Sequence, residues 1–314
     1  MVLDADRAAR LRRALVSLQG LSVGDAFGES FFGPPDVTEE RLATRRLAAR
    51  TWPWTDDTAM ALSVVDVLAS FDRVDPDALA EAFGRRHAAQ PDRGYGAGAR
   101  QILTAIAGGV GWTVAATLPF GAEGSHGNGG AMRAGPVGAY FADDLDRVVE
   151  EARASATVTH LHPEGQAGAV AVALAAAYAV RWRSAGAALH GQPLLDFVVG
   201  RTPPGPTRFG LEKARAMPPD ASVAHAAAVL GTGQNVSAAD TVPFSLWVAA
   251  RHLDSFEEAL WTTVSGLGDR DTTCAIAGSI VASSAGPESI PPRWLASREK
   301  LGSPYDPAAG GTDG

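Results

Sequence analysis

Two short acidic clusters, far apart in the chain, have the residue types and spacing for metal chemistry. They are Trp54-Thr55-Asp56-Asp57-Thr58 and Gly268-Asp269-Arg270-Asp271-Thr272. Each places two carboxylates beside threonine hydroxyls and leads into an apolar segment with helical spacing. This all-oxygen donor set, without cysteine or histidine, suits Mg²⁺, Mn²⁺ or Ca²⁺ better than Zn²⁺. If the fold joins the clusters, they predict a pair of divalent cations about 3.5–4 Å apart. A single cluster has a plainer interpretation, because acids at a helix start often cap it or complement its dipole.

Two glycine-rich segments, Arg93–Gly98 and Gly124–Arg133, each lead toward a segment with helical character. Glycines at a helix start let backbone N–H groups face an anion, and the positive helix end adds to the attraction. Together the two segments could hold the two phosphates of a diphosphate. Either one alone could equally be a turn. Neither follows a strand and neither carries a Walker lysine, so neither predicts a Rossmann or P-loop site.

The histidines, the serine and the cysteine give weaker indications. His160 and His162 are two residues apart, which does not place both on one helical face, and a zinc site would need more nitrogen or sulfur donors. One interpretation places His160 in the lining of a ligand pocket, whereas His162 more simply stabilises the turn before Pro163. Ser125 lies outside a nucleophile elbow. Cys274 is predicted to be a small buried residue rather than a catalytic thiol.

Two further residues stay open from spacing alone. Trp54 could stack on a ligand ring or anchor the first acidic cluster from the core. Glu29 lies in a predicted Gly-Asp turn at residues 24–29 and could face a cleft or solvent.

Helical periodicity dominates the chain, and alternating strand patterns are nearly absent. A first helix is expected around Leu11–Leu18, broken at Gly20 and Gly24, and a second after the first acidic cluster, from Met60 to Phe71. Further helices are expected at Ala78–Ala88, Ala99–Ile106, Asp144–Ala156, Gly165–Arg183, Ser222–Leu230, Thr241–Ala250, Ser255–Val264 and Thr272–Ser284. The pattern predicts an all-α fold, a compact orthogonal multi-helix bundle.

Length and composition favour one large domain. The chain has 314 residues, of which 46% are hydrophobic, and its net charge of −8 argues against a nucleic-acid-binding surface. The N-terminus lacks a signal-peptide core, and the longest apolar stretch, Ala167–Val180, is shorter than the roughly 20 residues that span a bilayer. A lone cysteine agrees with the reducing cytoplasm. We expect one domain over residues 1–301, a disordered tail over residues 302–314, no membrane association and a monomer.

Taken together and in order, these motifs resemble those of the ADP-ribosylglycohydrolase family, which includes the dinitrogenase-reductase-activating glycohydrolases. The resemblance covers Gly20 to about Ser284, and residues 93–98 and 124–133 are most similar to the branch that hydrolyses serine-linked ADP-ribose and poly(ADP-ribose). It implies an all-α fold with two divalent cations, Mg²⁺ or Mn²⁺, at the bottom of an ADP-ribose cleft.

The resemblance also assigns roles by motif. It implies that the metal ligands are Thr55, Asp56, Asp57, Asp269, Asp271 and Thr272. It implies that ADP-ribose contacts Gly94, Tyr95, Gly96, Gly98, Ser125, His126, Gly127, Asn128, Gly129, Met132 and His160. Cleavage at the ribose anomeric carbon passes through an oxocarbenium-like state, in which Asp57 or Asp271 could orient or deprotonate the attacking water.

One position departs from the serine-linkage branch. That branch has an acid–base glutamate four residues after the second glycine of the Gly24-Asp25-x-x-Gly28 motif, and here that position is Phe32. Glu29 is the nearby carboxylate that could take the role. The linkage therefore stays open among arginine-linked, serine-linked, O-acetyl and other ADP-ribosyl groups.

The leading hypothesis is a metal-dependent hydrolase that releases ADP-ribose from an ADP-ribosylated protein, nucleic acid or small molecule. A non-catalytic ADP-ribose-binding module and a metal-dependent phosphohydrolase of ADP-ribose-like diphosphates are the alternatives.

Overall fold

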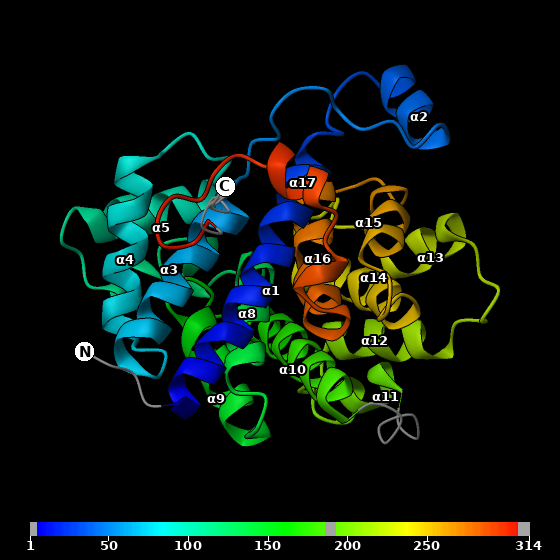
Figure 1. The fold of residues 1–314 in the computed structure, drawn as a ribbon. Helices are drawn as coiled ribbons and strands as arrows, with labels where there is room; N and C mark the ends of the chain where they lie inside the picture. Colours follow the sequence, from blue (N-terminus) through cyan, green and yellow to red (C-terminus); the bar gives the residue numbers. More distant parts are fainter. Residues whose placement is uncertain (1–4, 186–192, 307–314) are drawn as a thin grey trace, which may run out of the picture.

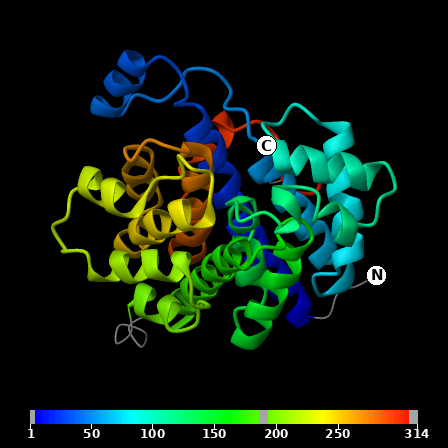
Figure 2. The same ribbon diagram turned by 180° about the vertical axis from the view of Figure 1, so that it is seen from behind.

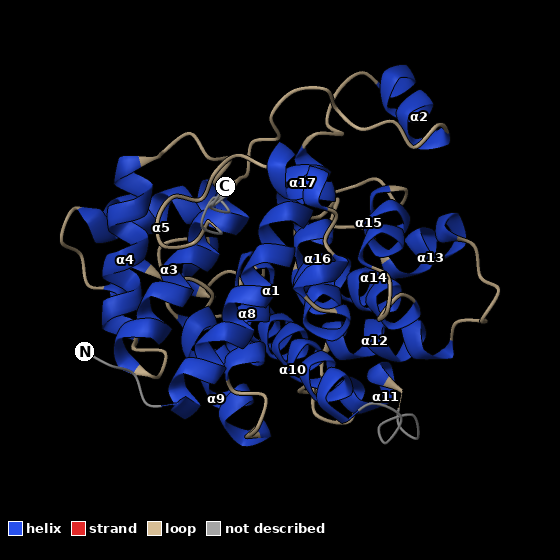
Figure 3. Cartoon of the chain, in the orientation of Figure 1, coloured by secondary structure: helices blue, strands red, loops and turns tan. Residues whose placement is uncertain are grey.

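A computed structural model describes residues 5–185 and 193–306, and every regular element in this part of the chain is a helix. The only strand-like pairing within it consists of two isolated bridges, Trp52 with Arg298 and Gly127 with Ser237. The predicted all-α multi-helix bundle is confirmed (Figure 3).

The longer helices are α1 Ala5–Glu29, α3 Asp56–Phe71, α4 Pro76–Ala89, α5 Ala97–Ala107, α9 Leu145–Thr157, α10 Pro163–Ala185, α12 Pro206–Ala216, α14 Ala238–Arg251 and α16 Arg270–Ala285. The shorter ones are α2 Pro35–Ala43, α6 Trp112–Ala115, α7 Gly129–Met132, α8 Gly135–Tyr140, α11 Leu194–Val199, α13 Val223–Leu230, α15 Phe256–Val264 and α17 Pro292–Ser297, with 3₁₀ turns η1 Phe120–Ala122 and η3 Pro287–Ser289.

Helices α1, α10 and α16 form the centre of the bundle. In both Figure 1 and Figure 2 they lie between a group containing α3–α5 and a group containing α11–α15, while α2 projects away from the body. Helix α10 is buried continuously from Ala167 to Val180, as expected for a central helix rich in small residues. Small side chains let its neighbours approach closely, so the bundle packs around a narrow axis.

Helix α1 runs without interruption through Gly20 and Gly24, so the predicted breaks are wrong. These glycines, with Gly28, lie four residues apart on one face, against the antiparallel helix α16. A Cβ atom at Gly24 would lie 2.1 Å from the carbonyl oxygen of Cys274. The glycines are therefore packing residues that allow backbone contact, and this outweighs their low helix propensity.

We expect Gly24→Ala to lower the free energy of unfolding by about 2–3 kcal/mol, because the added methyl group must push the two backbones apart. Gly33→Ala is the matched control, since a Cβ atom there would meet nothing within 4 Å. Its stability should stay within about 0.5 kcal/mol of the unmodified protein. Urea unfolding measures both, and equal stabilities would contradict this account of the α1–α16 contact.

The first part of the expected disordered tail is ordered. The Gln19 amide donates to the Tyr305 carbonyl, and Asp306 accepts from the Arg298 guanidinium and from the Leu301 and Gly302 amides. The tail prediction is wrong for residues 302–306, which sequence composition alone did not reveal because their partners are distant in sequence. Residues 307–314 lie outside the described part of the chain.

Among the described helices, none is long and apolar enough to cross a membrane.

Candidate active site

The fold brings the two acidic clusters together. Asp56 and Asp57 open α3, Asp271 opens α16, and the Thr272 hydroxyl donates to Asp57 Oδ2 over 3.5 Å. The two helix starts are alike: Thr55 and Asp269 are the N-caps, and the second acid of each pair follows two residues later. Two positive helix ends therefore face a shared group of carboxylates, which partly offsets their mutual repulsion.

Asp25 is a central member of this group that sequence reasoning missed. It lies on α1, is fully buried, and accepts hydrogen bonds from the backbone amides and hydroxyls of Thr55 and Thr58 at 2.5–3.2 Å. Its carboxylate thus fixes the start of α3. The Gly24-Asp25-x-x-Gly28 motif was the signal for Asp25. Because a turn was predicted there, the sequence did not indicate that Asp25 lies on a helix and points into the site.

Burial and like charges raise the pKa values of these acids. Burial is the largest cause for each of them. It raises the pKa of Asp25 to about 6, although four hydrogen bonds to its carboxylate lower that pKa. Burial and then the charge of Asp25 raise the pKa of Asp56 to about 7. Burial, followed by Asp25 and Asp271, raises the pKa of Asp57 well above its ordinary value. Burial, followed by Asp269 and Asp25, does the same for Asp271. The site therefore concentrates negative charge that a positive ion would compensate.

Two carboxylate oxygens in the group have no hydrogen-bond partner. Asp57 Oδ1 and Asp271 Oδ1 are both buried and unsatisfied. A buried acceptor of this kind is costly unless a donor or a cation meets it, so the donor set fits hard divalent ions. Within residues 5–185 and 193–306, no three side chains of the His, Cys, Asp and Glu types are arranged to hold one ion. Threonine hydroxyls would thus have to complete any ligand set here.

Glu29 lies at the edge of the acidic group. It is the last residue of α1 and follows Asp25 by four residues, so the two side chains share a helical face. Burial, followed by the charges of Asp25 and Asp269, raises its pKa, while Arg50 opposes the rise. Glu29 therefore faces the site from a helix, where a turn was predicted. Phe32 is 42% exposed and lies under the Arg270 guanidinium, whose carbon is 4.7 Å from its ring centre.

The first glycine-rich segment lies beside the acids. A Cβ atom at Gly94, whose φ is +86°, would be 3.7 Å from Asp56 Oδ1. Gly96 is the N-cap of α5 and Gly98 lies in its first turn, so free backbone amides of this helix are available close to the acidic group. A Cβ atom at Gly96 would meet nothing within 4 Å, which shows that the space beside the Gly96 Cα atom is open.

The second glycine-rich segment is anchored rather than helical. The one helix within it, α7, spans only one turn, so the predicted helix-end attraction is small. Asn128 donates to Asp269 Oδ2 over 2.7 Å and to the Thr241 hydroxyl over 3.0 Å. The Ser125 hydroxyl accepts from the Gly127 amide over 3.1 Å. The segment also pairs with residues 236–238, a loop that sequence reasoning left unassigned although Gly231 and Gly233 marked it.

His160 packs against this second segment in a fixed protonation form. Arg133 is fully buried and donates to the Thr159 hydroxyl, 2.8 Å away, which in turn lies 2.7 Å from His160 Nδ1. A guanidinium only donates, so the Thr159 hydroxyl accepts from Arg133 and can give its own hydrogen to Nδ1; the neutral ring then carries its hydrogen on Nε2. Burial, with Arg133 and His126, lowers the pKa of His160 to about 3, in agreement with a neutral ring.

The Nε2 atom of His160 faces the glycines. A Cβ atom would lie 3.4 Å from Nε2 at Gly127 and 3.2 Å from it at Gly129. His160 thus offers one N–H donor beside the glycine-rich segment that is predicted to hold phosphates or ribose. Arg133, which sequence reasoning also missed as a functional residue, holds the segment by a 2.6 Å hydrogen bond to the Gly129 carbonyl.

The side chains of three other predicted ligand contacts pack against protein groups. The Tyr95 side chain is 3% exposed and packs edge-on against His87, and Met132 is 4% exposed in the hydrophobic core. His126 is exposed and lies between the rings of Phe120 and His162.

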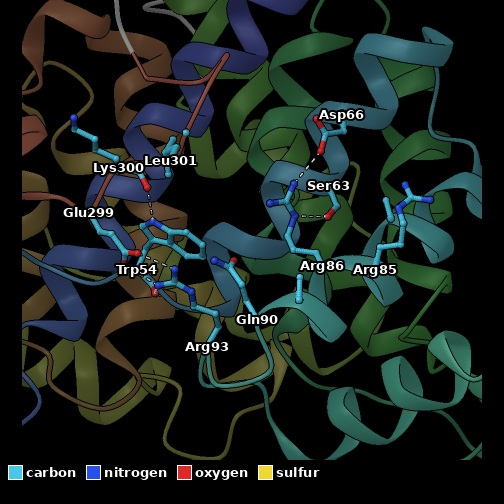
Figure 4. A pocket seen from close by; sticks show the side chains of 13 residues that line it. Trp54, Ser63, Asp66, Arg85, Arg86, Gln90, Arg93, Glu299, Lys300 and Leu301 are labelled. Carbon is cyan, nitrogen blue, oxygen red and sulfur yellow. Dashed lines mark hydrogen bonds and ion pairs between the residues drawn. The ribbon is translucent and has the colours of Figure 1, made fainter. Parts of the chain in front are cut away.

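Trp54 anchors the first acidic cluster from the core. Its ring is 4% exposed and lies 3.4 Å from the Arg93 guanidinium carbon, and its Nε1 donates to the Lys300 carbonyl over 3.4 Å. Arg93 also donates to the Trp54 carbonyl and makes a two-pronged ion pair with Glu299 (Figure 4). These residues line an open hollow of about 650 Å³ whose walls include none of the carboxylates Asp25, Asp56, Asp57, Asp269 and Asp271. The Arg93 guanidinium therefore covers a face of the Trp54 ring on which a ligand ring would otherwise stack.

A family model described as ADP-ribosylglycohydrolase matches residues 6–309. The chain belongs to the ADP-ribosylglycohydrolase family. It is 28% identical to the ADP-ribosylhydrolase ARH3 of Homo sapiens, over 93% of this chain and 90% of the relative. It is 25% identical to the ADP-ribosylarginine hydrolase Tri1 of Pseudomonas putida, over 91% and 74%. A solved ADP-ribosylglycohydrolase-related protein complex superimposes with a TM-score of 0.64 at 25% identity, covering 93% of this chain and 94% of that one.

Membership confirms the suspected family and the all-α ADP-ribosylglycohydrolase fold. It also supports ADP-ribosyl hydrolysis as the general activity, with ADP-ribose or an ADP-ribosylated compound as the ligand class.

Proposed function

We propose that this ADP-ribosylglycohydrolase is a metal-dependent enzyme that cleaves the glycosidic bond at the anomeric carbon of the distal ribose and releases ADP-ribose. The observation that carries the proposal is the meeting of the α3 and α16 starts, where Asp57 and Asp271 each retain a buried carboxylate oxygen without a partner. A purely structural cap would have satisfied both oxygens.

The metal ligands in this proposal are Thr55, Asp56, Asp57, Asp269, Asp271 and Thr272, with Asp25 holding Thr55 in place. Two divalent cations, Mg²⁺ or Mn²⁺, suit this oxygen set. When bound, they would supply positive charge and Lewis acidity to the ribose hydroxyls and to water.

The remaining residues bind and orient the substrate. Backbone amides at Gly94, Gly96 and Gly98 would bind one phosphate, and those at Gly127 and Gly129 the other. The Nε2–H group of His160 would donate to a phosphate or ribose oxygen next to them. Because His160 stays neutral, it can donate this hydrogen bond over the whole physiological pH range.

Glu29 and the two unsatisfied acids would handle protons. A raised pKa keeps Glu29 protonated to a higher pH than an ordinary carboxyl, so its carboxyl oxygen can donate a proton to the leaving atom. Asp57 and Asp271 would accept hydrogen bonds from the attacking water and orient it toward the anomeric carbon. The buried Cys274 agrees with a reducing compartment, and we place the enzyme in the cytoplasm.

A panel of substrates tests this function and identifies the linkage. Arginine-linked, serine-linked, O-acetyl and nucleic-acid-linked ADP-ribose would each be incubated with Mg²⁺, with Mn²⁺ and with chelator. We expect cation-dependent release of ADP-ribose from at least one substrate. Release of AMP and ribose phosphate would instead indicate a phosphohydrolase. No turnover, with ADP-ribose binding still seen by calorimetry, would indicate a binding module.

The relay from Arg133 through Thr159 to His160 gives a separate prediction. Thr159→Val should remove the hydrogen bond that fixes the His160 tautomer and lower ADP-ribose affinity about tenfold, since an unsatisfied buried group costs about 1–3 kcal/mol. Thr159→Ser keeps the hydroxyl and should retain affinity. Nitrogen-15 NMR of the histidine ring should show protonation on Nε2 in the serine variant and a mixture in the valine variant. Matching spectra and affinities would contradict the relay.

A further inference from the structure

A second open hollow lies between the end of α1 and the projecting helix α2. Its volume is about 470 Å³, and its walls include Phe32, Val37, Arg41, Arg46, Leu47 and Arg50. Phe32 and Val37 are each 42% exposed, so the hollow offers apolar surface beside arginines.

This hollow adjoins the acidic site. Ser30, which lines it, directly follows Glu29. The Arg270 guanidinium covers the Phe32 ring and donates to the Phe31 carbonyl over 2.6 Å. Arg270 lies between Asp269 and Asp271 in the sequence. Phe32, in the wall of the hollow, therefore contacts a residue that directly adjoins two of the proposed metal ligands. The glycine-rich segments contact the acids through other residues, Asp56 and Asp269.

The arginines of the hollow differ in how they are used. Arg41 is committed to the protein, because it donates to the Ser30 and Arg46 carbonyls and packs over Phe31. Arg46 pairs with Glu40 at the exposed surface. Arg50 is exposed and makes no hydrogen bond or ion pair within the described residues, and its charge acts on Glu29 only by lowering that carboxyl's pKa. Burial and the charges of Arg46 and Arg50 lower the pKa of Arg41, so the three cations repel one another and an anion between them would be favourable.

We propose that this hollow binds the aglycone of the substrate, and that the aglycone is a polypeptide with a carboxylate side chain next to the ADP-ribosylated residue. The proposal rests on the proposed function. The free Arg50 would pair with the carboxylate, while Phe32, Val37 and Leu47 would contact the adjoining peptide. A nucleic acid fits less well, because α2 carries Asp36, Glu39 and Glu40 and the whole chain has a net charge of −8.

The test compares two ADP-ribosylated peptides that differ only by Glu or Gln beside the modified residue, in whichever linkage the enzyme cleaves. We expect kcat/KM to be about threefold to fivefold higher for the Glu peptide, the range for an exposed ion pair. Arg50→Gln should abolish the preference, and Arg50→Glu should reverse it in favour of a Lys peptide. The ratio between peptides is the readout, because any effect of Arg50 on Glu29 is common to both. Arg12→Gln, an exposed change of equal charge on α1, should retain the preference.

The outcomes separate this inference from the proposed function. Equal kcat/KM for the two peptides in an active enzyme would overturn the peptide site alone. A preference that survives Arg50→Gln would assign it to another surface and overturn the role of the hollow. Faster cleavage of an ADP-ribosylated oligonucleotide that is lost in Arg50→Gln would replace the peptide by a nucleic acid. Absence of turnover on every linkage would overturn both proposals together.

Discussion

Asp57→Asn and Asp271→Asn should each lower kcat/KM for ADP-ribose release by about 10³-fold, the scale at which positioned acid–base groups act. Each change removes a negative charge from the proposed cation ligands and one oxygen that would orient water. Neither should unfold the protein, because a neutral amide relieves repulsion from Asp25 and the neighbouring acids. Steady-state kinetics and thermal melting of the cation-free proteins measure the two effects.

Asp220→Asn is the control for these variants, since Asp220 is exposed and outside the site. It should leave both rate and melting temperature unchanged. Full activity in both Asp57→Asn and Asp271→Asn would remove the metal hypothesis, whereas collapse of their melting temperatures would show a structural role instead.

The cation-free protein should lose stability as the pH rises from 5 to 8, and divalent cations should restore it. The pKa values of Asp25 and Asp56 are raised to about 6 and about 7, so these groups bind protons more tightly in the folded than in the unfolded chain. Their protonated forms stabilise the fold below the ordinary carboxyl pKa, and this contribution is lost as the pH passes through the raised values. A cation at 100 times its Kd adds about 2.7 kcal/mol, or roughly 5–10 °C in Tm, at pH 8.

At pH 5 protons compete for the same oxygens, so Mg²⁺ or Mn²⁺ should raise the Tm much less there. Thermal scans at both pH values, with each cation, with KCl of matched ionic strength and with chelator, make the comparison. The Asp57→Asn variant should lose most of the cation effect at pH 8. A Tm that is unaffected by divalent cations at pH 8 would contradict the proposed metal site.

Much of the fold was predictable because helical spacing and capping signals are local. The helix expected over Ala78–Ala88, for example, is α4, and the Asp75 side chain caps its start. The failures came from long-range contacts. Gly20 and Gly24 indicated a break when considered alone, and only contact with α16 explains why the helix continues. The ordered residues 302–306 depend likewise on Gln19 and Asp66, which are remote in sequence.

In the candidate site, too, residues in local motifs were predicted and residues whose roles depend on distant contacts were missed. Acids next to threonines were visible as local motifs, so the α3 and α16 starts were both found. Asp25 and Arg133 were missed because their roles depend on what they contact after folding, namely the start of α3 and the Thr159 hydroxyl. Tyr95 and Met132 stay predictions as ligand contacts: their side chains are buried, and a motif gives proximity to a ligand loop but not the direction of a side chain.

The antiparallel contact between α1 and α16 has a consequence for the order of synthesis. Asp25 and Asp271 enter the site from opposite ends of the chain, so a ribosome must make nearly all of the helices before the acidic group can exist. Helix α1 emerges with Gly20, Gly24 and Gly28 unpacked, and its partner α16 is available only after residue 285 has left the exit tunnel. Cation binding would therefore report that synthesis has passed α16, and a nascent chain stopped before Asp269 should bind none.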